Sequence, residues 1–265
     1  MPAGTPKQLP SPRMAPDTVV LEVAFIQLPN DAAGEDELWR QIDEQHWPAE
    51  VRRRLSDNGL RIGLLGTQMP DTLRSLLDVR AGVVDLLSQG GFPEQHGLPT
   101  FQQRLQVRGG QERKIRITQE ALEEMVIVLN EDGAVRARRF EKPQGLLNLC
   151  LHPLGDGRVR LELSPEIEYG ETRQRWVGGQ GQFAQISDRQ RCTFDKLRVT
   201  TTMAPGQTLI VTATSEAKGL GGHFFAALAS DHPTRSAMLV RIAQTQLDDL
   251  FAPPPQGASP APPAD

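Results

Sequence analysis

Apolar and polar residues alternate with a period of two through most of the chain after residue 100, and this pattern predicts β-strands. In the longest such run, residues 159–169, one face is apolar and the other is mainly charged. A strand with one buried and one wet face is typical of antiparallel sheets. The apolar members are Val159, Leu161, Leu163, Pro165, Ile167 and Tyr169, and the polar members are Arg160, Glu162, Glu166 and Glu168.

Turn-forming residues between the alternating runs predict a series of hairpins. The predicted pairs are Leu105–Val107 with Ile115–Ile117 around Gly109-Gly110, Met125–Leu129 with Ala134–Phe140 around Asn130–Gly133, and Leu146–Leu151 with Arg158–Tyr169 around Gly155–Gly157. Further strands are predicted at Thr193–Thr202, Thr208–Thr214, Gly222–Ala229 and Met238–Gln244, and none between Tyr169 and Thr193.

The chain before residue 100 has a different pattern, which predicts a small α+β unit. A β-branched run at Thr18–Leu28 predicts a strand, and Leu60–Leu65 predicts a second one. Between them, helical spacing over residues 36–58 is divided at Pro48 into two helices, because proline suits the first turn of a helix and not its interior. Gly59 follows at the position of a C-terminal cap. Shorter helices are predicted at Thr72–Leu77, capped by Asp71, and at Gly82–Gln89.

These elements predict an α+β fold, with a small N-terminal unit followed by a predominantly antiparallel β-sheet domain. The unit covers residues 17–90 and the β-rich domain covers residues 100–250, with the glycine- and proline-rich segment 90–99 as the boundary. Residues 1–16 and the proline-rich tail 252–265 contain too few apolar residues to offset the entropy of ordering them, so both are predicted to be disordered.

Composition narrows the classes of function. A net charge of -4 argues against a nucleic-acid-binding protein, which needs a basic face for phosphate contacts. The arginine clusters at residues 52–54 and 136–139 are interleaved or flanked with acids and are interpreted as solvated faces. No apolar run approaches the roughly 20 residues of a membrane-spanning helix. Residues 1–16 lack the apolar core of a signal peptide, so the N-terminus as given indicates the cytoplasm, unless the natural start lies upstream.

No motif for catalysis, for a cofactor or for a metal ion is present, and no site residue of these kinds is predicted. Cys150 and His152 are two apart on a predicted strand and share a face, so they could form a thiol–imidazole pair; a strand interior with no oxyanion hole speaks against this hypothesis. His223 follows the cluster Gly219–Gly222, which could cradle an anion or simply form a bend between strands. Cys150 and Cys192 could form one disulfide or remain two reduced, buried thiols.

Aromatic residues gather at one corner of the predicted N-terminal unit. Trp39 and Trp47 flank the turn His46-Trp47-Pro48, where they could either anchor the two helices in the core or line a small groove. The groove would suit a small ligand, and the anchoring role is the simpler interpretation.

Several segments of the β-rich part resemble the C-terminal β-domain of bacterial secretins, the ring-forming channels of the outer membrane. The resemblance covers residues 146–247 and also residues 18–28. It rests on the segments Val159–Ile167, Cys192–Thr202, Ala204–Val211 and Ala237–Ala243, in which Pro205-Gly206-Gln207-Thr208-Leu209-Ile210-Val211 follows the secretin turn D-G-Q-T-L-[VI]-[IV]. The resemblance implies a secretin-like sheet and a place in a cell-envelope or secretion-related assembly.

Three functions follow from these features. The first is a non-enzymatic structural or interaction module that binds protein partners, or a second copy of itself, through the edges of its sheets. The second is a cytoplasmic domain that binds a small ligand or has a regulatory role, with its pocket near Trp39 and Trp47. The third is a hydrolase that uses Cys150 with His152.

Overall fold

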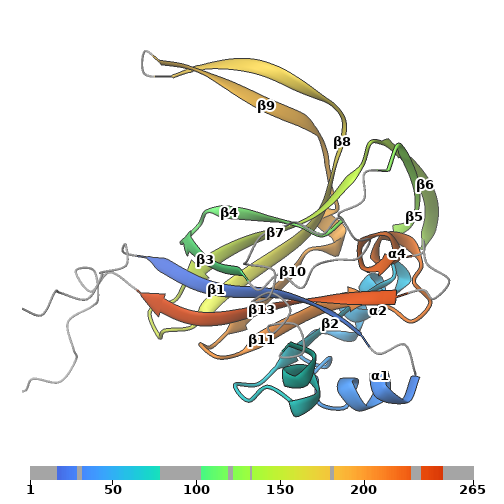
Figure 1. The fold of residues 1–265 in the computed structure, drawn as a ribbon, viewed down its shortest axis with the longest axis vertical. Helices are drawn as coiled ribbons and strands as arrows, with labels where there is room; N and C mark the ends of the chain where they lie inside the picture. The colour runs from blue at the N-terminus through green and yellow to red at the C-terminus, as the bar shows by residue number, and fades with distance from the viewer. Residues whose placement is uncertain are drawn as a thin grey trace, which may run out of the picture.

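Two antiparallel sheets packed face to face form the body of the protein (Figure 1). The computed structural model describes residues 17–28, 32–77, 103–118, 122–131, 133–179, 182–227 and 234–246. Sheet A has the order β2 (Leu60–Leu65), β11 (Thr208–Ala213), β13 (Thr234–Gln246), β1 (Thr18–Gln27) and β3 (Gln103–Arg108), and the short β12 (Ala226–Ala227) pairs with β13. Sheet B has the order β10 (Val199–Met203), β8 (Val159–Gly179), β7 (Gln144–Pro153) and β4 (Glu112–Arg116), and β9 (Gln182–Thr193) also pairs with β8.

The alternating pattern of the strands explains the packing of the two sheets. Every second residue of β1, from Val19 to Phe25, points between the sheets, and so do Val159, Leu161 and Leu163 of β8. These side chains are almost completely buried in one continuous apolar core. At about 25 cal/mol for each Å² of apolar surface removed from water, this core is the main source of stability.

The other face of sheet A is also covered. Ile26 of β1 and Ile210 of β11 pack in a second apolar cluster against Leu38 and Trp39 of α1 (Ala32–Trp39) and against Leu73, in the helical residues 71–77. The central strands of sheet A, β1, β11 and β13, are therefore covered on both faces, whereas the edge strand β3 keeps one exposed face. This explains why β1 reads as a nearly continuous apolar run rather than as a strict alternation.

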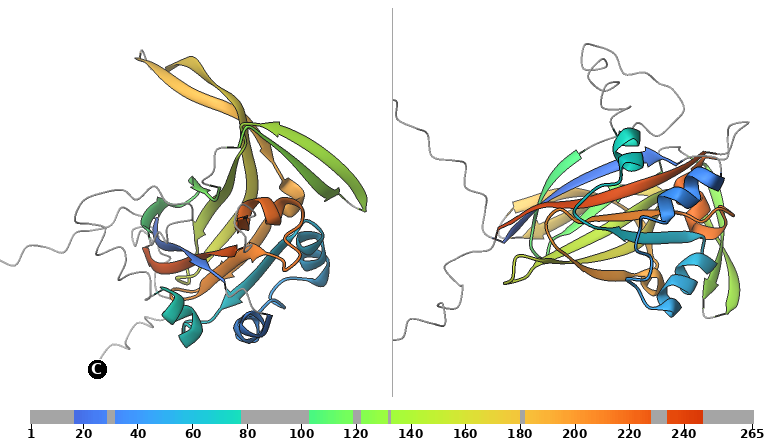
Figure 2. Two further views of the ribbon diagram at one scale, coloured as in Figure 1. Left: turned by 45° about the vertical axis from the view of Figure 1, so that its right-hand side comes forward. Right: turned by 90° about the horizontal axis from the view of Figure 1, so that it is seen from below.

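One end of the sandwich is closed by helices and by a separate hairpin. The helices are α2 (Ala49–Asp57) and α4 (Gly219–Phe225), and the hairpin consists of β5 (Glu124–Glu131) and β6 (Ala134–Glu141) (Figure 2). Asn58, at the end of α2, is 1% exposed and joins these parts. Its side-chain amide donates to the carbonyls of Arg54 and Asn130, and its side-chain oxygen accepts from the Asn130 amide.

The predicted fold class is confirmed: the sheets are predominantly antiparallel and the helices are few. Most of the predicted elements are present. They include the strands at residues 18–28 and 60–65, the helices on either side of Pro48, and the hairpins around residues 130–133 and 155–157. Sheet A combines β1 and β2 from the predicted 17–90 unit with strands of the predicted 100–250 domain. The tails 1–16 and 252–265, the helix Gly82–Gln89 and the boundary 90–99 lie outside the described residues.

Three local predictions are wrong. The runs around Gly109-Gly110 do not form a hairpin, because β3 pairs with β1 in sheet A and β4 pairs with β7 in sheet B. The Gly109 amide donates to the Asp17 carbonyl and the Gly110 amide to that of Leu151, so this turn carries the chain from one sheet to the other. The segment Gly222–Ala229, predicted as a strand, is helical as far as Phe225, and within its described part only Ala226–Ala227 form a strand, β12.

The third wrong prediction concerns residues 170–192, where no strand was expected. They complete β8 and β9, which pair beyond the sandwich as a long two-stranded arm (Figure 1). A break in the register between Tyr169 and Arg173, next to Gly170 at a φ of +77°, marks the place where the arm leaves sheet B.

Glu166, expected on a solvent-exposed face of its strand, is instead buried. Its carboxylate accepts hydrogen bonds from Asn148 and Thr193 on the two neighbouring strands.

Candidate functional site

Cys150 and His152 lie side by side on the outer face of sheet B, as their spacing predicts. The thiol sulfur is 3.4 Å from Nε2 of His152, and Oε1 of Glu162 on β8 is 3.9 Å from the same nitrogen. In a nucleophile–base–carboxylate arrangement the base contacts its two partners through different ring nitrogens. Here one nitrogen faces both groups, so Glu162 does not orient the imidazole toward the thiol.

The surroundings of Cys150 also oppose ionisation of the thiol. Burial raises the pKa of Cys150, and the carboxylates of Glu162 and Glu112 on the two adjacent strands raise it further. Since the thiolate is the reactive form, this site lacks the activation that a cysteine nucleophile needs. The described geometry thus gives the hydrolase hypothesis no support.

Alkylation of Cys150 should therefore be slow at neutral pH and should accelerate mainly above pH 9. Replacing Glu162 by Gln removes a nearby negative charge, and we expect the alkylation rate at pH 8 to rise about two- to fivefold because the pKa of the thiol falls. Mass spectrometry after timed exposure to iodoacetamide measures this rate, and Glu50→Gln, at an exposed position of α2, is the control. Rapid alkylation of the unmodified protein at pH 6 would instead reveal an activated nucleophile.

The two cysteines are free thiols on opposite faces of sheet B. Cys150 lies opposite the outward-facing Glu162, whereas Cys192 lies opposite Ile167, whose side chain points into the core. Strand neighbours on opposite faces point away from one another. A disulfide between these two cysteines would therefore require the sheet to rearrange.

The glycine cluster before His223 has a packing role. The amide of Gly221 donates to the Asn58 carbonyl, and a Cβ on Gly221 would stand 1.8 Å from the carbonyl oxygen of Gly59. Only glycine permits this approach of α4 to the end of α2. Nε2 of His223 contacts the Val126 carbonyl at 3.2 Å, and burial lowers the pKa of this histidine. The cluster thus holds helices together, and its Gly221 amide is already satisfied by the protein itself.

Both tryptophans at the predicted corner are buried. Trp47 belongs to the core between the sheets, and its indole nitrogen donates to the Thr200 carbonyl at 3.2 Å, while the neighbouring His46 contacts the Thr201 hydroxyl at 2.7 Å. Trp39 packs in the outer cluster, beneath the guanidinium of Arg61 at 3.8 Å. Anchoring is therefore their structural role. A groove does lie nearby, beside α2, but neither tryptophan is among the described residues that line it.

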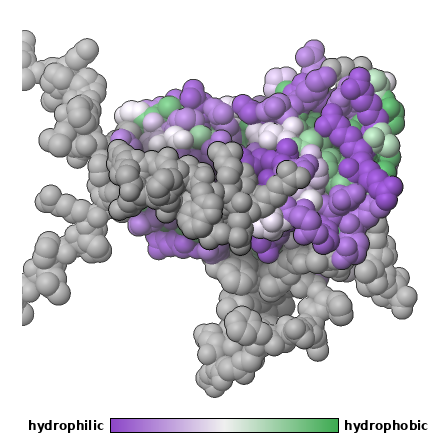
Figure 3. Space-filling model, turned by 90° about the horizontal axis from the view of Figure 1, so that it is seen from above, coloured by the Kyte–Doolittle hydropathy of each residue, from purple (hydrophilic) through white to green (hydrophobic). Residues whose placement is uncertain are grey.

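An exposed apolar surface on the β5–β6 hairpin was not predicted from the sequence. Within the described chain, the large apolar side chains that remain exposed all belong to the hairpin or directly precede it: Leu122 (41%), Val126 (50%), Val128 (51%) and Val135 (70%). Val126, Val128 and Val135 lie on one face of the hairpin, opposite the buried face of Met125, Ile127 and Leu129. We call these three valines the valine surface (Figure 3).

The outer edge of β6 adjoins the valine surface and is open. Among the described strands, β6 hydrogen-bonds only to β5, so one side of its backbone has no strand partner. Arg136 and Arg138 project from the other face of β6 and share a single carboxylate, that of Glu131, at 3.6 and 3.0 Å. The edge therefore carries one uncompensated positive charge beside an apolar surface. Arg139 forms its own ion pair with Glu124.

The described residues contain no group of three or more His, Cys, Asp or Glu side chains that could hold a metal ion. None of the helices in the described ranges is both long enough and apolar enough to cross a lipid bilayer. Comparison of the chain with known protein families, with characterised proteins and with solved structures finds no match.

Proposed function

We propose that this protein is a non-enzymatic interaction module that binds an extended segment of a partner protein along the free edge of β6. The observation that carries the proposal is the valine surface, because exposed apolar side chains concentrated on one element mark a protein-interaction site. An unpaired strand edge beside such a surface can add another strand through backbone hydrogen bonds.

The charges on β6 indicate what kind of strand it would accept. If a second copy of β6 paired antiparallel about Ala137, each Arg136 would lie directly opposite Arg138 of the other copy, and such like-charge pairs are destabilising. A strand with acidic side chains opposite Arg136 and Arg138 would instead supply the missing negative charge. Apolar side chains of that strand would cover Val135 and Ala137. The expected partner segment therefore alternates apolar and acidic residues.

The secretin resemblance of residues 146–247 supports an assembly in the cell envelope as the setting for this module. The segments that carry the resemblance form parts of β8, β9, β10, β11 and β13, so most of them lie in the sandwich and not in the hairpin. In this proposal the sandwich is the scaffold, and the β5–β6 hairpin is the element that recognises the partner.

A peptide of four Val-Glu repeats, labelled for fluorescence anisotropy, tests the proposal directly. We expect it to bind at least about tenfold more tightly than the matching Val-Lys peptide, because only the acidic peptide complements Arg136 and Arg138. Binding should also protect the backbone amides of residues 134–138 from hydrogen exchange, as measured by NMR.

Two substitutions locate the binding site. Val135→Glu places a carboxylate on the edge strand and should weaken binding of the Val-Glu peptide about fivefold or more, whereas the isosteric Val135→Thr should change it less than twofold. Equal binding of both peptides, or indifference to Val135→Glu, would contradict the proposal. A concentration-dependent dimer that Val135→Glu dissociates in sedimentation experiments would identify a second copy as the occupant of the edge.

A further inference from the structure

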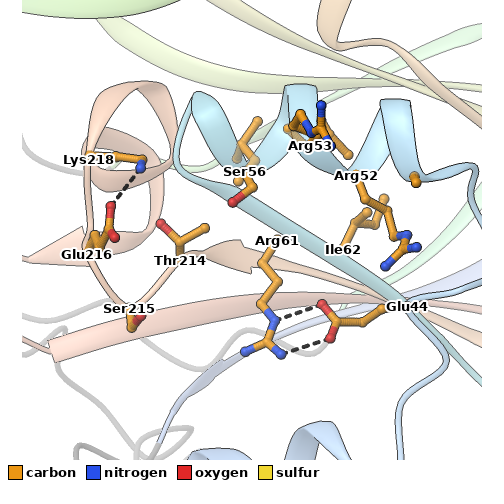
Figure 4. A pocket seen from close by; sticks show the side chains of 13 residues that line it. Glu44, Arg52, Arg53, Ser56, Arg61, Ile62, Thr214, Ser215, Glu216 and Lys218 are labelled. Carbon is orange, nitrogen blue, oxygen red and sulfur yellow. Dashed lines mark hydrogen bonds and ion pairs between the residues drawn. The ribbon is translucent and has the colours of Figure 1, made fainter.

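We propose that the groove beside α2 binds a phosphate monoester group of a small organic molecule. This groove, which we call the α2 groove, lies between α2, β2 and the loop of residues 214–218 (Figure 4). It encloses about 430 Å³, within the size range of small-molecule sites. The site is separate from the β6 edge and goes beyond the interaction function proposed above.

The groove has more positive than negative charge. Its lining contains the four cations Arg52, Arg53, Arg61 and Lys218, but only two carboxylates. Both carboxylates are already paired. Glu44 accepts two hydrogen bonds from Arg61 at 2.7 and 2.8 Å, and Glu216 accepts one from Lys218 at 2.6 Å (Figure 4).

Arg52 and Arg53 supply the excess charge. No carboxylate of the described chain lies within 4.0 Å of either guanidinium. Nε of Arg52 donates to the Trp47 carbonyl at 3.2 Å, which holds the side chain in place and leaves its two terminal nitrogens as donors. The site therefore offers two guanidinium groups that have no ion-pair partner within 4.0 Å among the described residues.

Hydroxyl groups add neutral donors to the same groove. Ser56 extends from α2 with an exposed side chain, and Ser215 and Thr214 belong to the loop that forms the other wall of the groove (Figure 4). The Thr214 hydroxyl oxygen is buried and has no hydrogen-bond partner in the described structure. Because protein atoms cover this oxygen, an anion in the groove would be held by the exposed hydroxyls of Ser56 and Ser215 instead.

The floor of the groove is rigid. Arg61 is held by Glu44, lies 3.5 Å from a carboxylate oxygen of Glu35, and stacks on the Trp39 ring. Beside it, Leu55, Leu60 and Ile62 contribute apolar lining. A preformed floor reduces the entropy that a ligand must overcome on binding, and the apolar lining suits an organic body.

These features favour a phosphate ester over a carboxylate. A phosphate monoester carries a charge of about -1.5 to -2 at pH 7 and has three acceptor oxygens, which matches two arginines and the hydroxyls of Ser56 and Ser215. A single carboxylate would leave one guanidinium uncompensated. Arginine is also the side chain whose planar fork best fits phosphate oxygens.

Calorimetric titration of the full-length protein with phenyl phosphate, in a low-salt buffer free of phosphate, tests the site. We expect saturable binding at a single site, and no binding of phenol, which lacks the phosphate. Arg53→Gln and Arg52→Gln should each weaken binding about tenfold or more. The control Arg113→Gln removes an exposed cation from β4, in the other sheet, and should change the affinity less than twofold.

A second variant separates binding from folding. Ser56→Ala removes an exposed hydroxyl that lines the groove, so it should weaken phenyl phosphate binding severalfold while the melting temperature stays nearly unchanged. Inorganic phosphate that binds as tightly as phenyl phosphate would identify free phosphate as the source of the anion at this site. Absence of saturable binding of either anion, or an equal loss of affinity in Arg113→Gln, would overturn the proposal.

Discussion

Replacing Gly221 by alanine is expected to destabilise the protein by about 3 kcal/mol or more. The added methyl group would stand 1.8 Å from the Gly59 carbonyl oxygen and 2.8 Å from the Leu60 amide nitrogen. Both are backbone atoms in the buried junction between α2 and β2, so no flexible side chain can move aside. Relief of the overlap would require α4 to move away from α2, with loss of the hydrogen bond from Gly221 to Asn58.

Thermal unfolding followed by circular dichroism measures this effect. A loss of about 3 kcal/mol corresponds to a fall in melting temperature of roughly 6–12 °C for a domain of this size. Gly155→Ala is the matched control, because nothing lies within 4 Å of the position of its Cβ, and we expect its melting temperature to change by less than about 2 °C. Equal melting temperatures for the two variants would show that the close approach of α4 to Gly59 is not present in solution.

Replacing Glu35 by alanine should cost about 3 kcal/mol at neutral pH. The Glu35 carboxylate on α1 is 7% exposed, and both of its oxygens accept hydrogen bonds from Arg235 of β13, which is itself 14% exposed. Removing one partner of a buried ion pair leaves an uncompensated charge, and this penalty usually exceeds the value of the pair itself. The pair also joins α1 to sheet A, so the outer helical layer should loosen in this variant.

The contribution of Glu35 should depend on pH in a defined direction. Hydrogen bonding to Arg235 lowers the pKa of Glu35 in the folded protein below its ordinary value of 4.5. A carboxyl group with a lowered folded-state pKa stabilises the protein above its unfolded-state pKa, and this stabilisation is lost as the pH falls through the folded-state pKa. The difference in stability between the natural protein and Glu35→Ala should therefore be constant near pH 7 and shrink below about pH 4.5.

Urea unfolding at pH 7 and at pH 3.5 measures both parts of this prediction. Glu37→Ala is the control, because Glu37 lies on the same helix and pairs with Arg40 where both side chains are more than half exposed. Such surface pairs contribute little, so we expect a change below about 0.5 kcal/mol at either pH. A stability difference for Glu35→Ala that does not change with pH would refute the role assigned to its ionised form.

The sequence predicts the hairpins whose two strands are neighbours along the chain. The turn at residues 155–157 is one example, because the glycines and Asp156 specify a chain reversal and the flanking alternation specifies the strands. The same reasoning fails at Gly109-Gly110. Glycine indicates a sharp turn, but the strand that follows belongs to a different sheet. This change of sheet depends on contacts with Asp17 and Leu151, which lie outside the local sequence.

The features of the candidate sites depend in the same way on distant contacts. Val126 and Val128 belong to a continuous apolar run, and only the packing of Met125 and Ile127 against the core decides that the two valines are the exposed members. Arg52 and Arg53 look like an ordinary solvated helix face in the sequence. They become part of a candidate binding site because the fold places the loop at residues 214–218 on the opposite wall of the groove.

The pairing of β1 with β13 has a consequence for the order of events during synthesis. Thr18 and Gln246 are register partners, so β1 must wait for β13, which is synthesised much later than β1. Hairpins such as β5–β6 and β7–β8 can form as soon as they leave the ribosome, whereas sheet A cannot close until β13 has emerged. During that interval β1 and β11 both lack the strand that separates them in the finished sheet. The nascent chain would then expose two apolar strand edges, and such unpaired edges are sites where incompletely folded chains associate with one another.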